Sequence, residues 1–385
     1  MRFNRHSHFL VCISVGLLVA LGLVMLASTS VWVENEGQQY YHLTRQVVWV
    51  LVGIGAAFFA AASDYRNLRQ YWPWMLGIAC FLLALCYVPG IALERNGEAR
   101  WIKVPGIGQF QPSEAAKPVV IIVLAAWFAR YQAETKKFWR GFVLPMALLG
   151  IPTGLIFFEK DMGTAVSVGA AGFAILYVAG TRLPYLIASV AAGGSMFWYF
   201  VRSNENRWNR IVAFLDLEAH KLGVGLQQWR SLQAFASGGV TGRGLGNGAE
   251  KHDYLPFAHT DFIFPMIGEE LGLWFTLAVV LCFVCIAVFG FLIALHASDP
   301  FGRYLAVGVT AMIVVPAMLN IAVTTAVLPN TGLPLPFVSY GGSNLVFALF
   351  CAGLLISVHR RSVVIEQGVL PFEKKKPNHR YAVRM

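Results

Sequence analysis

The stretch HFLVCISVGLLVALGLVMLAS, from His8 to Ser28, decides what kind of fold this chain adopts. It is 21 residues long and contains no Lys, Arg, Asp or Glu. A helix of about 20 apolar residues spans the hydrocarbon core of a bilayer. Arg2 and Arg5 precede the stretch and no convincing cleavage site follows it. We therefore predict an uncleaved membrane helix rather than a signal peptide.

The rest of the chain shares this apolar character. Of its 385 residues, 57% are hydrophobic and 13% are charged, whereas a soluble domain carries about 25% charged residues. The sequence predicts an all-α, polytopic membrane helix bundle of about ten transmembrane helices. The predicted spans are 8–28, 44–62, 71–88, 114–129, 141–158, 162–179, 184–201, 271–295, 304–328 and 343–358.

The distribution of charge orients this bundle. With both ends in the cytoplasm, the inner side holds 17 Lys and Arg against 5 Asp and Glu, and the outer side holds 13 against 15. This asymmetry follows the positive-inside rule, so we predict cytoplasmic N- and C-termini. The net charge of +10 is then a signal of topology and does not indicate nucleic-acid binding.

The same reading divides the chain into one domain and a tail. In lipid each helix satisfies its own backbone, so one bundle can use the whole chain. We expect a single transmembrane domain over residues 1–361 and a short basic cytoplasmic tail over residues 362–385. A large extracytoplasmic loop, at about residues 202–262, is predicted between the seventh and eighth helices.

Ionisable residues beside apolar segments are the first candidates for a site. Asp261 lies in the polar run 251–264, and Lys117 lies about one turn inside an apolar span. Such groups are costly without a function or a partner, so both are candidate site residues and Lys117 should meet an anion. Arg100 can add a bidentate grip on a phosphate. Glu114 falls in a first helical turn, where its charge complements the helix dipole.

Two segments rich in glycine or proline are predicted to have different roles. Residues 329–344 contain three prolines and three glycines, so they cannot form a regular helix. Irregular backbone near membrane depth must be satisfied by protein or a wet cavity, so we expect this segment to line the site. Residues 242–248 lack a P-loop or dinucleotide-binding context and are interpreted as a flexible turn rather than a phosphate cradle.

Five motifs in this order resemble the SEDS family (shape, elongation, division and sporulation), whose members polymerise cell-wall glycan outside the bacterial inner membrane. They are RWI at 100–102, QPSE with its following Lys at 111–117, HTDFIF at 259–264, GEELG at 268–272 and LPFVSYGGSN at 335–344. The resemblance covers nearly the whole chain and is closer to the division branch than to the elongation branch. One departure is Lys160, where the family usually has a proline before Asp161.

The resemblance implies a peptidoglycan glycosyltransferase that polymerises lipid II at the outer face of the cytoplasmic membrane during cell division. Asp261 matches the family's essential aspartate and would act as the general base, while basic residues hold the leaving diphosphate. The residues expected to bind substrate are Lys117, Arg100, Trp101, Glu114, Arg210, His259, Asp161, Ser339 and Ser343.

The resemblance also implies where the protein works and with what. We expect a multi-pass protein of the bacterial inner membrane at the division septum. Its partners would be lipid II, the growing glycan strand, a class B penicillin-binding protein, other divisome proteins and membrane lipid. No cofactor is required by the pattern. A divalent cation, Mg²⁺ or Mn²⁺, is left open as a bridge between a carboxylate and the diphosphate, because no ligand cluster demands one.

Several alternatives stay open at the level of sequence. A lipid II flippase would use the same charges as a path, although no self-similarity between the two halves supports it. An elongation-type polymerase is a second alternative, and a noncatalytic scaffold is a third. At the residue level, Asp261 would in the simplest alternative only cap the following helix. His259 would either position the substrate or pack against its neighbours.

Overall fold

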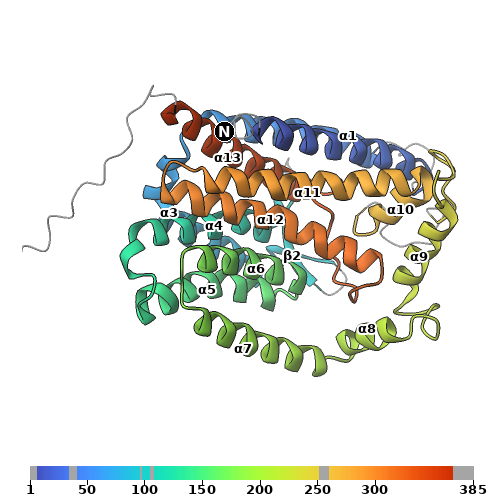
Figure 1. Ribbon diagram of the computed structural model, residues 1–385. Coiled ribbons are helices and arrows are strands. Elements are labelled where there is room, and N and C mark those ends of the chain that lie inside the picture. The colour runs from blue at the N-terminus through green and yellow to red at the C-terminus, as the bar shows by residue number, and fades with distance from the viewer. Residues whose placement is uncertain (1–6, 34–40, 96–97, 105–107, 251–259, 367–385) are drawn as a thin grey trace, which may run out of the picture.

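The computed structural model describes residues 7–33, 41–95, 98–104, 108–250 and 260–366. Over these residues the fold is a helix bundle with one small sheet (Figure 1). The elements are α1 (Ser7–Val33), α2 (Tyr41–Ala62), η2 (Tyr65–Asn67), α3 (Leu68–Leu85), β1 (Ala92–Arg95), β2 (Glu98–Val104), β3 (Gly108–Phe110), α4 (Pro112–Arg130), η3 (Gln132–Glu134), η4 (Trp139–Val143), α5 (Leu144–Phe158), α6 (Met162–Val178), α7 (Leu183–Arg202), α8 (Glu205–Leu215), α9 (Leu226–Gly238), α10 (Ile263–Leu271), α11 (Leu273–Leu295), α12 (Pro300–Thr324) and α13 (Gly342–Glu366).

The predicted polytopic helix bundle is confirmed, and each of the ten predicted spans coincides with a helix. Eight helical segments in the described part of the chain are long and apolar enough to cross a membrane. They are α1, α2, α4, α5 with the π-helical turn before it, α7, α11, α12 and α13. Of the other two, α6 is a shorter apolar helix of 17 residues and α3 has 18 residues. The chain is a multi-pass membrane protein.

Helix α4 forms the centre of the bundle. It packs against α3, α5, α6 and α12, and most of its side chains are buried. Helix α12 in turn packs against α6, α11 and α13. Around this core, α1 pairs with α11, and α2 pairs with α13. Helix α7 lies apart along one side of the molecule (Figure 1), in contact mainly with α8 and α6.

A three-stranded antiparallel sheet, β1-β2-β3, connects α3 to α4 and is the one departure from the predicted all-α fold among the described residues. Ile102 of β2 pairs with Ala92 on one side and with Phe110 on the other. The strands of the sheet have four, seven and three residues, so they form no long apolar run that would have predicted them. Strand β2 carries Arg100 to the turn between α5 and α6, where it donates to the Lys160 carbonyl oxygen.

The polar tract at 202–262 contains two helices, α8 and α9, where the sequence indicated only a loop. The buried face of α9 consists of Gln228, Ser231, Ala234 and Gly238, spaced three or four residues apart. These side chains are polar or small, which is why apolar periodicity does not reveal the helix. Gln228 Nε2 donates to the Val323 carbonyl oxygen at 2.9 Å and thereby caps the end of α12.

The predicted eighth span, 271–295, begins one residue before Gly272, which has a φ of +80°. A Cβ atom at this glycine would lie 2.4 Å from the Gly242 nitrogen, so only glycine fits. The chain before it forms the short helix α10, and the membrane helix α11 begins after it, at Leu273. The separate α10 matters because its first residue follows Asp261 by two positions.

The glycine-rich segment 242–248 is anchored by two carboxylates from α10, which corrects the expectation of a flexible turn. Glu269 and Glu270 are both 0% exposed. The Gly246 backbone N–H donates to Glu270 Oε2 at 3.0 Å, and the Ala249 N–H donates to Glu269 Oε1 at 2.7 Å. The Arg243 and Gly244 N–H groups donate to the backbone carbonyls of Glu269 and Glu270, so N–H groups that a phosphate cradle would offer are bonded within the protein.

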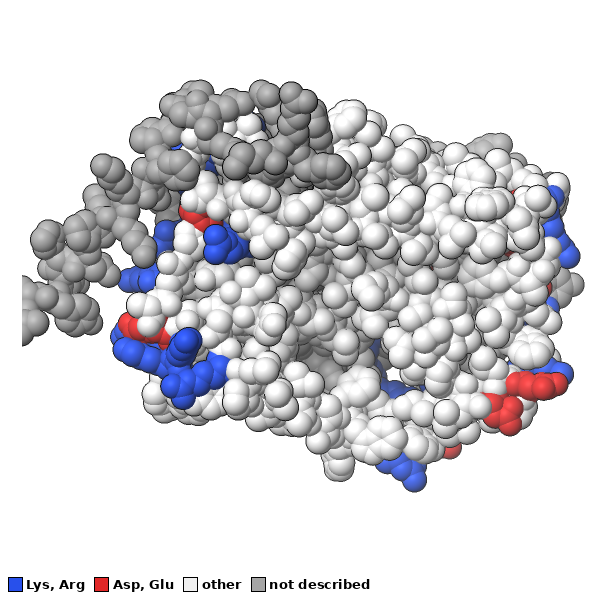
Figure 2. All heavy atoms as spheres, in the orientation of Figure 1, with Lys and Arg blue, Asp and Glu red and all other residues white. Residues whose placement is uncertain are grey.

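The beginning of α1 and the end of α13 lie at the same end of the bundle. The rings of His8 and His359 stack there with their centroids 4.6 Å apart. On the face shown in Figure 2, Lys and Arg side chains gather mainly towards the two ends, and most of the surface between them carries no charged side chain. That this end is cytoplasmic stays a prediction. Helix α13 continues to Glu366, past the predicted domain boundary at 361, and the tail from 367 lies outside the described residues.

Candidate functional site

Asp261 lies in the turn that leads into α10, and its backbone is held from α12. Asn320 Nδ2 donates to the Asp261 carbonyl oxygen at 2.7 Å and to the Leu333 carbonyl oxygen at 2.7 Å. One buried amide thus joins the Asp261 turn to the proline-rich segment. A polar residue in the middle of an apolar span is the sequence signal that would have found Asn320.

The proline-rich segment 329–341 closes the other side of this turn. Ser339 Oγ donates to the Thr260 carbonyl oxygen at 2.6 Å and accepts from the Leu335 N–H at 2.8 Å. Its hydroxyl therefore links two backbones. Gly332 lies beside the carboxylate, because a Cβ atom at this position would be 3.5 Å from Asp261 Oδ2. The irregular backbone predicted for this segment does line the surroundings of Asp261.

Gln46 of α2 supports the segment from behind. Its Nε2 donates to the Ser339 carbonyl oxygen at 3.3 Å, and its Oε1 accepts from the Gly341 N–H at 3.3 Å. Gln46 is 3% exposed. Like Asn320, it is a polar side chain in an apolar span that satisfies irregular backbone. Gln46 is not among the residues that the sequence predicts for the site.

Arg100 and Asp161 meet at the turn between α5 and α6. Arg100 Nη2 donates to the Lys160 carbonyl oxygen at 2.6 Å, and its Nη1 lies 3.9 Å from Asp161 Oδ1. Asp161 caps α6 by accepting from the Thr164 N–H at 3.1 Å. Lys160 has a φ of +67°, which proline cannot adopt. The departure from the family's proline is therefore accompanied by a left-handed turn that directs a carbonyl at Arg100.

The charges around Asp261 set its acidity. Burial raises the pKa of Asp261 to about 7, the negative charge of Asp161 adds to this, and the positive charges of Arg100 and Arg210 oppose it. Burial and the charge of Asp161 likewise raise the pKa of Glu159 to about 8. The pKa of Asp261 thus lies near neutral pH, which suits a general base.

Lys117 and Glu114 form a separate ion pair in α4. Lys117 Nζ lies 2.7 Å from Glu114 Oε1, and both side chains are buried. The anion expected beside Lys117 is therefore supplied by its own helix. Among the described charges, those that shift the pKa of Asp261 come from Asp161, Arg100 and Arg210. Lys117 is not among these charges, although the sequence predicts both Lys117 and Asp261 to belong to the site.

Gln111 connects the two groups of charges. Its Nε2 donates to Asp161 Oδ2 at 3.3 Å, and its backbone N–H donates to Ser343 Oγ at 3.3 Å. Gln111 is the N-cap of α4, the helix that carries Glu114 and Lys117. Ser343 lies at the start of α13, so three elements meet here.

The remaining predicted residues lie in different surroundings. Trp101 follows Arg100 in β2, where its backbone pairs with Leu93. Successive side chains of a strand point to opposite faces, so Trp101 does not share the face of Arg100. Arg210 is exposed on α8. The face in view of Figure 2 is hollowed between the α7–α8 arm and the bundle, and Lys or Arg atoms are visible there. His259 lies outside the described residues.

A multi-pass helix bundle with a carboxylate site of raised pKa, held between irregular segments, defines a membrane protein with a polar reaction or transport centre. The chain belongs to the FtsW, RodA and SpoVE family: the family model described as "Cell cycle protein" matches residues 8–363.

Relatives and solved structures agree with this membership. The chain is 38% identical over 347 residues to a probable peptidoglycan glycosyltransferase FtsW of Geobacter sulfurreducens, covering 89% of this chain and 92% of the relative. It is 36% identical to stage V sporulation protein E of Bacillus subtilis, covering 90% and 95%.

The fold is also similar to solved structures. A chain of a peptidoglycan synthase complex, described as coordinating polymerization and crosslinking, matches with a TM-score of 0.76 and 27% identity, covering 91% of this chain and 97% of that chain. The crystal structure of the Thermus thermophilus rod shape determining protein RodA matches with a TM-score of 0.66 and 26% identity, covering 91% and 96%.

Proposed function

We propose that this chain is a peptidoglycan glycosyltransferase that polymerises lipid II into glycan strands at the outer face of the cytoplasmic membrane during cell division. The observation that carries the proposal is the Asp261 carboxyl, whose pKa is raised to about 7 beside the positive charges of Arg100 and Arg210. The names of the relatives, peptidoglycan glycosyltransferase and FtsW, support the reaction and the division pathway.

The reaction joins two lipid-linked disaccharides. The 4-hydroxyl oxygen of one attacks the anomeric carbon of the other, a new C–O bond forms, and the bond from that carbon to undecaprenyl diphosphate breaks. Asp261 takes the hydroxyl proton. Arg100 and Arg210 stabilise the negative charge that develops on the diphosphate. Asn320 and Ser339 fix the backbone around Asp261, so the base is held in place before substrate arrives.

The first experiment removes the base and keeps its shape. Asp261→Asn retains the backbone contacts of the turn, so the variant should fold. Loss of a general base lowers a rate by about 100-fold or more. The full chain with its transpeptidase partner would be given lipid II, and polymer length and amount would be followed on a gel.

A matched control is available in the same outer tract. Asp216 is an exposed aspartate at the end of α8, and Asp216→Asn should polymerise at the normal rate. Normal polymerisation by Asp261→Asn would show that Asp261 is not the base. A different result would favour the flippase alternative over the glycosyltransferase. In that result, neither Asp261→Asn nor Asp216→Asn polymerises lipid II, and both move labelled lipid II across the membrane of a vesicle.

A divalent cation, Mg²⁺ or Mn²⁺, stays open as a bridge between a carboxylate and the diphosphate. Within the ranges that the structure describes, no group of three or more His, Cys, Asp or Glu side chains could hold a metal ion. A cation held by one or two carboxylates and the substrate diphosphate would need no such group, and the steps above use no cation.

The working context follows from the same proposal. We place the protein in the bacterial inner membrane at the division septum, with a class B penicillin-binding protein as its transpeptidase and with other divisome proteins. A solved structure of similar fold belongs to a peptidoglycan synthase complex, which supports a partner of this kind. An elongation-type polymerase would share the reaction and differ in partner and location.

A further inference from the structure

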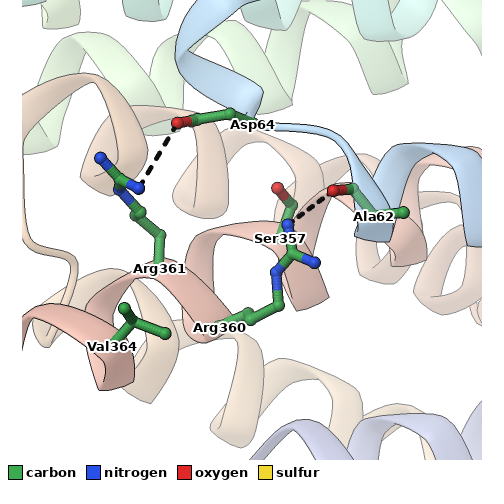
Figure 3. A pocket seen from close by; sticks show the side chains of 6 residues that line it. All are labelled: Ala62, Asp64, Ser357, Arg360, Arg361 and Val364. Carbon is green, nitrogen blue, oxygen red and sulfur yellow. Dashed lines mark hydrogen bonds and ion pairs between the residues drawn. The ribbon is translucent and has the colours of Figure 1, made fainter. Parts of the chain in front are cut away.

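A cavity of about 310 Å³ lies where α2 and α13 leave the bundle. Figure 3 shows its lining: Ala62, Asp64, Ser357, Arg360, Arg361 and Val364. Ala62 is the last residue of the membrane helix α2. Four lining residues, Ser357, Arg360, Arg361 and Val364, belong to the last turns of α13. The cavity therefore lies at the depth where a span leaves the hydrocarbon core and lipid headgroups begin. The Ser343 end of α13, by contrast, belongs to the candidate functional site.

Two guanidinium groups face this cavity with donors to spare. Arg360 Nη2 donates to the Ala62 carbonyl oxygen at 2.6 Å, and Arg361 Nη1 lies 3.8 Å from Asp64 Oδ2. Arg361 Nε is buried and has no hydrogen-bond partner. Each guanidinium has five N–H donors, and these contacts use few of them. Asp64 is the one acidic side chain in the lining, so positive charge is in excess.

The contact between Arg361 and Asp64 is weak and can be exchanged. Their side chains are 28% and 33% exposed, and 3.8 Å is long for an ion pair. Exposed pairs of this kind contribute little to stability. The phosphodiester of a lipid headgroup offers two charged, non-bridging oxygens that a guanidinium fork can bind bidentately, so it is a stronger partner for Arg361 than a distant carboxylate.

We propose that this cavity binds the phosphate of an anionic phospholipid headgroup between Arg360 and Arg361. Ala62 and Val364 supply an apolar wall beside the arginines, as a lipid with a charged head and an acyl chain requires. Basic pockets at the cytoplasmic ends of membrane helices suit such headgroups. The chain's own residues 367–385 are a poor occupant, because they carry five Lys or Arg and one Glu.

The experiment titrates the full chain in neutral detergent with phosphatidylglycerol and counts bound lipid by native mass spectrometry. The wild type should bind one lipid saturably, and an Arg360→Gln, Arg361→Gln double variant should bind it about tenfold more weakly or worse. The control is Lys137→Gln with Arg140→Gln, which removes two charges that also pair with one carboxylate, Glu134. This control should bind phosphatidylglycerol as the wild type does.

A gain of affinity provides a second arm that does not depend on a damaged variant. Asp64→Asn removes the competitor for Arg361 and can keep the cap that Asp64 makes to the Arg66 N–H at 3.1 Å. It should bind phosphatidylglycerol more tightly than the wild type. Equal loss in both double variants, or no gain in Asp64→Asn, would overturn the site. Equally tight binding of phosphatidylcholine or of inorganic phosphate would overturn an anionic lipid as the ligand.

Discussion

Asp261 needs two properties that oppose each other in a membrane protein. A carboxylate must lose solvent to become a useful base near neutral pH, yet it must stay reachable by a sugar hydroxyl. Burial and the charge of Asp161 supply the first property, and Arg100 and Arg210 keep the shift within bounds. The position in a turn, with intermediate exposure, supplies the second.

The pH dependence of the rate follows from this balance. The base is active when deprotonated, so the polymerisation rate should rise with pH through the pKa of Asp261, about 7, and level off above it. Asp161→Asn removes a charge that raises this pKa and can keep the cap of α6, so the rising limb should move to lower pH. Initial rates measured across this range test it. A limb that stays in place or moves to higher pH would contradict the assignment.

Turns between helices, rather than the helices themselves, carry the site. The α5–α6 turn holds Arg100 through the Lys160 carbonyl oxygen. The turn before α10 carries Asp261, and the irregular segment before α13 is bonded to this turn through Ser339. Two of the three non-glycine residues with positive φ in the described chain, Lys160 and Phe337, lie in these connections. Strained backbone of this kind gathers at functional sites.

The turn at Lys160 can be tested by its backbone. Lys160→Pro should destabilise the protein by more than about 1 kcal/mol, because proline cannot adopt a positive φ. Lys160→Gly should stabilise it slightly, because glycine adopts this conformation without strain. Lys160→Ala is the control, since it removes the charge and keeps the strain. Apparent melting temperatures in detergent should rank Pro lowest and Gly highest; a proline variant as stable as the wild type would refute the left-handed turn.

At the scale of the whole molecule, the two ends of the bundle have different tasks. One end brings α4, α6, α10 and α13 together around the carboxylates. The other holds the start of α1 and the end of α13 together and carries the arginine-lined cavity. The start of α1 and the end of α13 lie at the same end, which agrees with the prediction that both termini lie on one side of the membrane.

The predicted orientation has a direct test. A fluorescent protein fused after Glu366 should be bright in cells, because it stays in the cytoplasm where it folds. Alkaline phosphatase inserted after Leu222, which is 88% exposed in the tract between α8 and α9, should be active, because it needs an oxidising outer compartment. The reverse pattern would invert the topology and with it the location of the proposed reaction.

The sequence by itself determined the membrane class, the ten helices and the segment that holds Asp261. Apolar length and charge asymmetry act locally and are visible without a partner. It did not reveal α8, which is a short helix of 11 residues, α9, whose buried face is polar or small, or the sheet, whose strands are short.

Only the tertiary structure decided which charges meet. Lys117 pairs within its own helix, whereas Asp261 is surrounded by Asp161, Arg100 and Arg210, which come from three other parts of the chain. Asn320 and Gln46 acquire their roles only because packing brings irregular backbone within reach of their amides. Such contacts join residues far apart in sequence, and a pattern along the chain holds no record of the distances between them.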